Sequence, residues 1–410
     1  MITGKLYNKQ TGLIALRGIS VFAKFLFTVL FFKATEAGFG EYSLVATSII
    51  LLVFVLGLDF YSYANRAILE PGSNPQKIIF NQFGLYFILY LILLPVIYLI
   101  FLSLDFDTHY YWYFYFILIT EHFNTEFYRL LFVFKKPLAA NINLFLRNGL
   151  WVWFAVLYMY FNEQVDLLLI LKLWLIGNLL AVFYSLFISR RKSYKIESDN
   201  FKWDFKWIKT GIYVSIPYIL GTIAYKTIEF SDRYMIDYFM DKRAVGVYSF
   251  FANMANVMNI VLFTAVISVL YPVLVESIMQ KNQNKFKETY DKFRKELLYY
   301  GIGISFVLFI ALPLILVWIG KTVYLHQFYI FFVLIMANML LNFSFLHHFV
   351  IYAFKKDWKI FQATFVAAVI NILLNLLLIP LMGILGASIA TLISYFIIWY
   401  LKRNMANVSL

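Results

Sequence analysis

The sequence predicts an all-α integral membrane protein with about twelve transmembrane helices. Of its 410 residues, 62% are hydrophobic and only 14% are charged, a balance far from that of soluble globular domains. A membrane-spanning helix needs about 20 mostly apolar residues, and joints that are charged or contain Pro or Gly divide the chain into about twelve such runs. Basic residues collect in alternate joints. We therefore expect nearly the whole chain to lie in a membrane.

The expected spans follow one another with short joints. The first run lacks a small-residue cleavage site after a short apolar core, so we expect it to be retained as a span and not removed as a signal peptide. The spans of the first half cover 12–33, 42–64, 78–102, 109–134, 137–161 and 165–189. Those of the second half cover 208–239, 244–276, 297–319, 325–354, 358–381 and 383–402. The halves define an N-lobe at 1–189, a basic linker at 190–207 and a C-lobe at 208–410.

The basic joints fix the expected orientation. Lysines and arginines crowd the termini and every second joint, whereas the opposite joints contain only Lys33, Lys242, Arg243 and Lys321. Because basic residues stay on the cytoplasmic side, both termini are expected in the cytoplasm. The net charge of +13 is thus explained by topology, and no nucleic acid is expected as a partner.

Two basic joints are longer than the others. Residues 190–209 carry Trp203, Phe205 and Trp207, which would let this segment lie at the lipid headgroups. Residues 277–296 have a spacing that suits a helix extending span 8 or entering span 9, with its charged face near anionic lipid.

The two halves carry a short internal echo. Gly40-Glu41-Tyr42-Ser43 opens span 2, and Gly246-Val247-Tyr248-Ser249 opens span 8. With the spans divided six and six, this pattern favours a duplicated architecture of two pseudo-symmetric lobes, which is common in transporters.

Six cations lie inside the apolar runs, where each costs at least about 2.5 to 3.5 kcal/mol near the bilayer centre. Such side chains usually face a partner, a wet cavity or an anionic cargo. They are the candidate substrate-binding residues: Arg17, Lys24, Arg147, Lys172, Lys226 and Arg233.

Several of these cations have an acid within reach. Arg147 on span 5 and Glu121 on span 4 fall at similar depth, so an ion pair is expected. On span 7, Glu229 can satisfy either Lys226 or Arg233. Lys172 lies in the outer half of span 6, where its stem can reach the interface.

Two further features concern the remaining charges. Glu126 and Arg129, three residues apart on span 4, are expected to form a local pair. Arg17 and Lys24 are seven residues apart on one face of span 1, which carries no acid of its own. This face is therefore the strongest candidate for binding an anion.

Intramembrane carboxylates are candidates for proton or sodium coupling. They are Asp59, Glu121, Glu229 and Asp232. Asp59, toward the inner end of span 2, has no acid or base partner on its own helix. There is no cysteine, and the five histidines show no metal-ligand spacing, so neither a metal nor a catalytic residue is expected.

Four segments resemble a known family. They are Glu36 to Tyr42, residues 231–249, Asn371 to Pro380 and Gly383 to Thr391. They are similar to the polysaccharide transporter family of the MOP exporter superfamily, whose Wzx-type members flip lipid-linked O-antigen, capsule or exopolysaccharide repeat units. The resemblance implies a MATE-like fold, with two six-helix lobes forming a V around a central cavity.

Small and amide side chains in these segments have plain packing roles. Gly383, Gly386, Ala387 and Ala390 give span 12 a face that another helix can approach closely. Asn371 and Asn375, one turn apart on span 11, can hydrogen-bond between helices or line the cavity.

The resemblance also implies a function. A flippase would move a polyprenyl-diphosphate-linked oligosaccharide from the cytoplasmic to the outer leaflet of a bacterial inner membrane by alternating access, driven by a proton or sodium gradient and without a cofactor. Guanidinium and ammonium groups would offset desolvation of the diphosphate. Membrane lipids, and the polymerase and chain-length regulator of the same pathway, would be its partners.

Two alternatives remain open. A multidrug extruder could use the same fold, although it moves cations, which unpaired basic residues disfavour. A membrane enzyme acting on lipid-linked sugars would need a sizeable aqueous loop, and no outer joint exceeds about ten residues, short of the loops that carry active sites.

Overall fold

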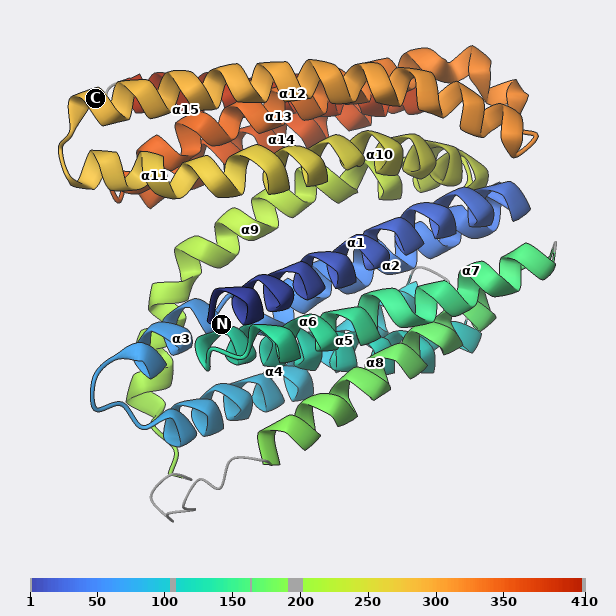
Figure 1. Ribbon diagram of the computed structural model, residues 1–410. Coiled ribbons are helices and arrows are strands. Elements are labelled where there is room, and N and C mark those ends of the chain that lie inside the picture. Colours follow the sequence, from blue (N-terminus) through green and yellow to red (C-terminus); the bar gives the residue numbers. More distant parts are fainter. Residues whose placement is uncertain (1, 104–107, 163, 191–201, 408–410) are drawn as a thin grey trace. The chain divides into compact units, whose positions relative to one another are not determined.

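The computed structural model describes residues 2–103, 108–162, 164–190 and 202–407, and these residues form helices joined by short turns (Figure 1). They fall into two compact units. Unit 1 comprises Met1–Leu30 and Val45–Ile219, and unit 2 comprises Phe31–Leu44 and Leu220–Leu410. The first turns of α2 thus pack with unit 2, and the first turns of α9 with unit 1. The expected lobes 1–189 and 208–410 stay a prediction, and residues 191–201 of the linker lie outside the described part.

The helices of the first half follow the expected order. A short 3-10 turn, Thr108–Tyr110, precedes α5, and a π-helical turn, Leu146–Leu150, joins α6 to α7. The helices are α1 (Ile2–Ala34), α2 (Glu36–Gly57), α3 (Tyr61–Leu69), α4 (Pro75–Ser103), α5 (Tyr111–Val133), α6 (Pro137–Phe145), α7 (Trp151–Phe161) and α8 (Leu167–Arg190).

The second half is built in the same way. A π-helical turn, Phe263–Ile267, joins α10 to α11, and a 3-10 turn, Thr322–Gln327, precedes α13. The helices are α9 (Phe205–Phe239), α10 (Lys242–Leu262), α11 (Ser268–Met279), α12 (Gln283–Trp318), α13 (Phe328–Ala353), α14 (Asp357–Met382) and α15 (Ile384–Asn407).

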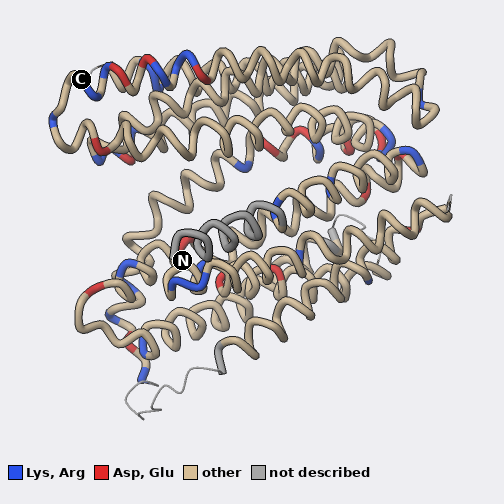
Figure 2. The backbone as a smooth tube through the Cα atoms, in the orientation of Figure 1, with Lys and Arg blue, Asp and Glu red and all other residues tan. Residues whose placement is uncertain are grey.

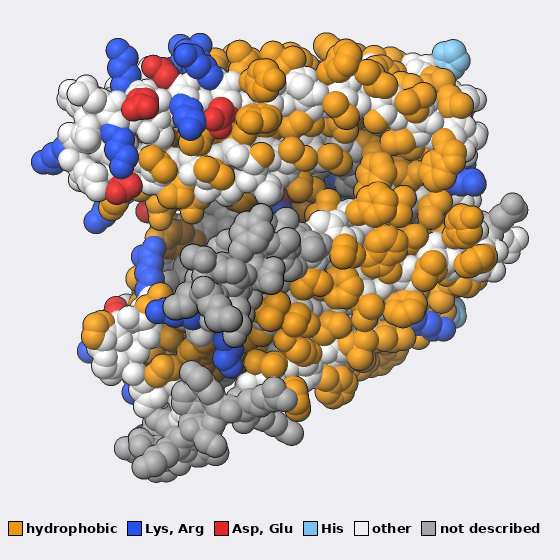
Figure 3. Space-filling model, viewed as in Figure 1, with side chains coloured by type: hydrophobic (Ala, Val, Ile, Leu, Met, Phe, Trp, Pro, Cys, Tyr) orange, Lys and Arg blue, Asp and Glu red, His pale blue; other side chains and the backbone are white. Residues whose placement is uncertain are grey.

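The length and apolar character of the helices confirm the predicted all-α membrane fold. In the described ranges, nine helical stretches are long and apolar enough to cross a membrane. The remaining long helices, α1, α5 and α9, carry intramembrane charges. Together they match the twelve expected spans. Hydrophobic side chains cover a large part of the described surface seen in Figure 3, as expected for a surface that faces lipid.

Span 2 is interrupted, which the sequence analysis did not predict. Leu58 and Asp59 have φ of 48° and 49°, a left-handed conformation that ends α2 before α3 begins at Tyr61. No proline marks the break. It is held by Phe60, which is fully buried and packs edge-on against Tyr63 and Trp207. The expected continuous span 42–64 is therefore wrong at its inner end.

The start of α9 is docked on α4. Asp204 accepts hydrogen bonds from the Trp207 amide (3.0 Å) and from Lys77 Nζ (3.0 Å). Chiefly because of the Trp207 amide, and further because of Lys77, the pKa of Asp204 is lowered. Trp203 packs against Phe80 and stacks on Phe205. Trp203 and Phe205 are exposed. Trp207, expected at the lipid headgroups, instead contacts the core around Phe60.

The basic joint 277–296 enters span 9. Asn282 accepts a hydrogen bond from the Lys285 amide (3.0 Å) and so caps α12, which continues unbroken from Gln283 to Trp318. Many of the charged residues of unit 2 lie at the end where α12 begins (Figure 2).

The echoed glycines form one helix crossing inside unit 2. A Cβ on Gly40 of α2 would lie 1.9 Å from the Lys242 carbonyl oxygen, and a Cβ on Gly246 of α10 would lie 1.9 Å from the Glu36 carbonyl oxygen. Each glycine thus faces the residue four positions before the other. Only glycine allows the two backbones to approach this closely.

Two turns repeat between the halves in a way that the sequence analysis missed. Lys135 ends α5 with φ of 55°, and Lys355 ends α13 with φ of 56°. The next residues, Lys136 and Lys356, donate their amides back to Leu131 and Ile351. The Phe-Lys-Lys motif closes the joints after spans 4 and 10 identically, as a duplication would require.

The family-like segments at the end of the chain pack as expected. A Cβ on Gly386 would lie 2.2 Å from the Leu378 carbonyl oxygen, so this face of α15 touches the α14 backbone. Asn371 accepts from Ser231 Oγ (2.9 Å) and from Asn375 Nδ2 (3.1 Å). The amide pair thus hydrogen-bonds α14 to α9.

Candidate functional site

The basic face of α1, formed by Arg17 and Lys24, lies in unit 1 along the continuous helical rod made of α6, the π-helical turn and α7. Arg17 Nε donates to Asn141 Oδ1 (2.8 Å), and Lys24 Nζ lies 3.4 Å from Asn148 Oδ1. Both contacts join residues 124 positions apart, so the two helical rods run parallel and in register. Arg17 Nη2 also approaches the hydroxyl of Tyr128 at 3.2 Å.

Close backbone approach keeps this register. A Cβ on Gly149 would lie 2.6 Å from Ser20 Oγ, while Ser20 is itself hydrogen-bonded to the Leu16 carbonyl (2.9 Å). On α1, Ser20 lies between Arg17 and Lys24. On the facing rod, Gly149 directly follows Asn148. The small residues Ser20 and Gly149 therefore keep Arg17 and Lys24 close to Asn141 and Asn148.

Arg147 lies behind this face in a buried network. Its Nη1 donates to Glu121 Oε2 (2.9 Å) and to Thr125 Oγ1 (2.6 Å). The other oxygen of Glu121 accepts from Trp174 Nε1 (2.8 Å). Arg147 and Glu121 are only 7% and 8% exposed, and the expected ion pair is confirmed. Arg147 belongs to the π-helical turn, a feature frequent at functional sites.

Two cations on α1, Arg17 and Lys24, have neutral hydrogen-bond partners. Among the side chains that the structure describes, Arg17 and Lys24 make no hydrogen bond or ion pair with a carboxylate; their partners are amides and a phenol. Lys24 is within electrostatic range of Glu121 and Arg147, but both oxygens of Glu121 already accept hydrogen bonds. Both cations are also exposed. The face therefore carries positive charge that no described carboxylate neutralises by direct contact.

A second polar cluster surrounds the break in span 2. Glu126 binds Arg129 as expected and also accepts from Gln82 Nε2 (2.9 Å) and the Tyr86 hydroxyl (2.9 Å). Asp59 is buried and interacts electrostatically with Glu126 and Arg129. Two carboxylates and one guanidinium thus share a buried region of unit 1.

The two predicted site cations of unit 2, Lys226 and Arg233, have partners on α9 and α10. Lys226 Nζ binds Glu229 Oε2 (2.6 Å). Arg233 Nη1 donates to the Glu229 carbonyl (2.7 Å), and its Nε donates to Ser249 Oγ (3.2 Å). Asp232 accepts from the Tyr248 hydroxyl. These contacts give Arg233 and Asp232 a role in joining α9 to α10.

The structure therefore brings together only part of the predicted set. Arg17, Lys24 and Arg147 share one site with Glu121. Lys172 is exposed on α8 and has no contact with that site. Charge and helical spacing did not predict the polar partners of this site, which are Asn141, Asn148, Tyr128, Thr125 and Trp174. The seven-residue spacing of Asn141 and Asn148, equal to that of Arg17 and Lys24, was the available signal.

Solved structures share this fold. An inward-facing multidrug resistance MATE family transporter of the MOP superfamily matches with a TM-score of 0.74 and 14% identity, over 95% of this chain and 94% of that one. A MATE in complex with MaD3S has a TM-score of 0.61 and 15% identity, over 97% and 96%. A MOP superfamily transporter from Pyrococcus furiosus, described as having a binding pocket of reverse polarity, has a TM-score of 0.56 and 15% identity, over 100% and 92%.

These likenesses define the fold: the chain is a multi-pass membrane protein with the fold of the MATE transporters. Residues 9–278 match the model of the family described as "Polysaccharide biosynthesis protein". The chain belongs to this polysaccharide biosynthesis family, as its motifs indicated. A search of curated proteins gives no match.

Proposed function

We propose that this protein is a flippase for polyprenyl-diphosphate-linked oligosaccharide repeat units. It moves them from the cytoplasmic to the outer leaflet of a bacterial inner membrane by alternating access, with both of its own termini in the cytoplasm. Membership of the polysaccharide biosynthesis family supports the cargo class, and the MATE fold supports the mode of transport.

The observation that carries the proposal is the basic face of α1. Arg17 and Lys24 keep their charges beside neutral amides, with the Arg147–Glu121 pair behind them. A diphosphate that leaves water needs such donors, because charge-assisted hydrogen bonds are about twice as strong as neutral ones. A cationic drug would be repelled by the same face, which disfavours multidrug extrusion.

The gradient that drives transport would act through a buried carboxylate. Asp59 is the preferred site, because it is buried and lies within electrostatic range of a second buried carboxylate, Glu126. A proton or a sodium ion would neutralise it. Glu121, Glu229 and Asp232 are the other candidates; Glu121 and Glu229 bind cations, and Asp232 accepts a hydrogen bond from Tyr248.

Complementation tests the site. In a strain lacking the chromosomal copy, Arg17→Ala/Lys24→Ala is expected to leave less than about a tenth of the surface glycan, because each lost charge-assisted bond is worth roughly 1.5 to 3 kcal/mol. Membrane immunoblots check that the protein is present. Lys206→Gln/Lys209→Gln removes two exposed charges at the start of α9 and is the matched control.

Three outcomes would contradict the proposal. Normal surface glycan from Arg17→Ala/Lys24→Ala would remove the site assignment. Export of cationic dyes by the wild-type protein, without any effect on glycan, would favour the multidrug extruder. Turnover of a sugar donor by the purified protein would point instead to an enzyme.

A further inference from the structure

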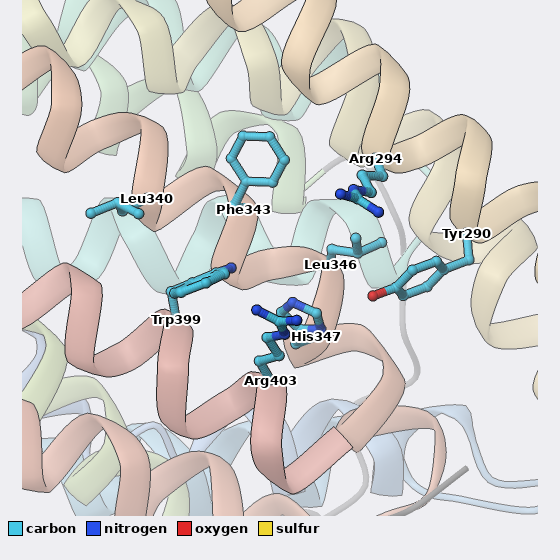
Figure 4. A pocket seen from close by; sticks show the side chains of 8 residues that line it. All are labelled: Tyr290, Arg294, Leu340, Phe343, Leu346, His347, Trp399 and Arg403. Atoms are coloured by element: carbon cyan, nitrogen blue, oxygen red, sulfur yellow. The ribbon is translucent and has the colours of Figure 1, made fainter. Parts of the chain in front are cut away.

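Unit 2 contains a cavity that the proposed transport site does not use. It has a volume of about 290 Å³ and lies between α12, α13 and α15, close to the lower end of the range for small-molecule pockets, about 300 Å³. Its lining combines cations, aromatic rings and aliphatic side chains (Figure 4). The residues are Tyr290, Arg294, Leu340, Phe343, Leu346, His347, Trp399 and Arg403.

Two guanidinium groups enter this cavity from different helices. Arg294 comes from α12 and Arg403 from α15, and His347 of α13 lies beside Arg403 (Figure 4). Both arginines act electrostatically on the His347 ring and on Tyr290. His347 is only 6% exposed. Arg294 and Arg403 are themselves exposed, so the two cations converge from the surface on a cavity that contains the buried His347.

This positive charge is not cancelled within unit 2. Neither Arg294 nor Arg403 forms an ion pair with any described carboxylate; Asp291, an exposed neighbour on α12, acts on Tyr290. Buried Lys402 adds a third positive charge that also acts on His347. Three cations that form no ion pair with a described carboxylate thus lie near one cavity, which favours the binding of an anion there.

The other wall is apolar. The Arg403 guanidinium lies 5.3 Å from the centre of the Trp399 ring, and Phe343 and Leu340 line the same side of the cavity (Figure 4). The cavity thus has a charged part, formed by the arginines, and an apolar part that can contact hydrocarbon. A fully hydrated inorganic anion would contact only the charged part.

The depth of the cavity matches that of a lipid headgroup. Arg294 lies three residues before the apolar run of α12 begins at Leu297, and Arg403 follows the apolar run of α15. The surrounding end of unit 2 carries many lysines and arginines, with aspartates and glutamates between them (Figure 2). Basic pockets between membrane helices at this level are suited to anionic headgroups.

We propose that this cavity binds the phosphate of an anionic phospholipid headgroup. Arg294 and Arg403 would each donate charge-assisted hydrogen bonds to phosphate oxygens. Trp399, Phe343 and Leu340 would contact the glycerol and the first carbons of an acyl chain. This site is separate from the α1 face in unit 1, and the proposal does not depend on the transported cargo.

Native mass spectrometry of the purified full-length protein tests the proposal. With phosphatidylglycerol, the wild type is expected to retain one lipid at least about tenfold more strongly than with phosphatidylcholine. Arg294→Gln/Arg403→Gln should abolish this preference. Lys287→Gln/Lys295→Gln removes the same charge from exposed positions of α12 outside the cavity and should keep it.

Further arms identify the ligand. Inorganic phosphate and pyrophosphate should not displace the bound phosphatidylglycerol, and displacement by either would show a free-anion site and overturn the lipid assignment. Equal retention of both lipids by the wild type would overturn it without any variant. If Arg294→Gln/Arg403→Gln does not fold, Arg294→Lys/Arg403→Lys keeps the charge but loses the planar fork, and should weaken retention severalfold; unchanged retention would contradict the assignment.

Discussion

The glycine crossing of α2 and α10 gives the sharpest stability prediction, through Gly246→Ala. The new Cβ would lie 1.9 Å from the Glu36 carbonyl oxygen, although contacts below 3.0 Å are essentially never found. Because this oxygen belongs to the backbone, the two helices would have to separate by about 1 Å.

The expected cost follows from two opposing terms. Overpacking at a backbone contact costs about 3 kcal/mol, while alanine gains about 1 kcal/mol over glycine inside a helix. The net loss of about 2 kcal/mol should lower the unfolding temperature by about 4 to 8 °C for a unit of this size. Thermal unfolding of the detergent-purified protein measures it.

Gly303→Ala is the matched control. This glycine lies in α12 of the same unit, and no heavy atom outside its own stretch of helix backbone lies within 4 Å of the position that the new methyl group would take, so the helix-propensity gain should raise the unfolding temperature by about 2 to 4 °C. Gly40→Ala/Gly246→Ala should cost less than the sum of the single changes, because one separation relieves both clashes. An unfolding temperature of Gly246→Ala equal to that of Gly303→Ala would refute the crossing.

Two further predictions concern unit 1. Arg147→Met leaves the Glu121 carboxylate buried and unpaired and should cost about 3 to 5 kcal/mol, whereas Arg147→Met/Glu121→Gln should recover much of that loss because Gln can still accept from Trp174; equal unfolding temperatures for the two variants would contradict the buried pair. Asp204→Ala should cost about 1 kcal/mol at neutral pH through loss of the cap on α9. Since the pKa of Asp204 is lowered in the folded protein, the contribution of its charge is complete above the ordinary carboxyl pKa and is lost as pH falls through the folded value. The gap in unfolding temperature between wild type and Asp204→Ala should therefore narrow in acid, and a gap that widens would be inconsistent with the Lys77 and Trp207 contacts.

Much of the candidate site was readable from helical spacing. Arg17 and Lys24 were placed on one face because seven residues make nearly two turns, and the pairs Arg147–Glu121 and Lys226–Glu229 followed from depth and spacing. The amide row of Asn141 and Asn148 was missed, because a neutral side chain inside a span gives no signal of cost comparable to that of a charge.

Other features lay beyond any local pattern. The break at Leu58 and Asp59 has neither proline nor glycine within it, and the conformation is held by packing of Phe60 against Trp207, about 150 residues away in the chain. The glycine echo was visible in the sequence, but its cause, mutual backbone contact, was not.

The sequence by itself determined the membrane environment, the number of long helices and which charges lie within them, because apolar length and hydration cost are properties of local composition. Tertiary structure alone decided which of those charges stay uncompensated. Pairing depends on where distant helices meet, and it left Arg17 and Lys24 beside amides while it gave Arg147 a carboxylate. The cavity of Arg294 and Arg403 exists for the same reason: three helices converge there without contributing an acid that pairs with either arginine among the described residues.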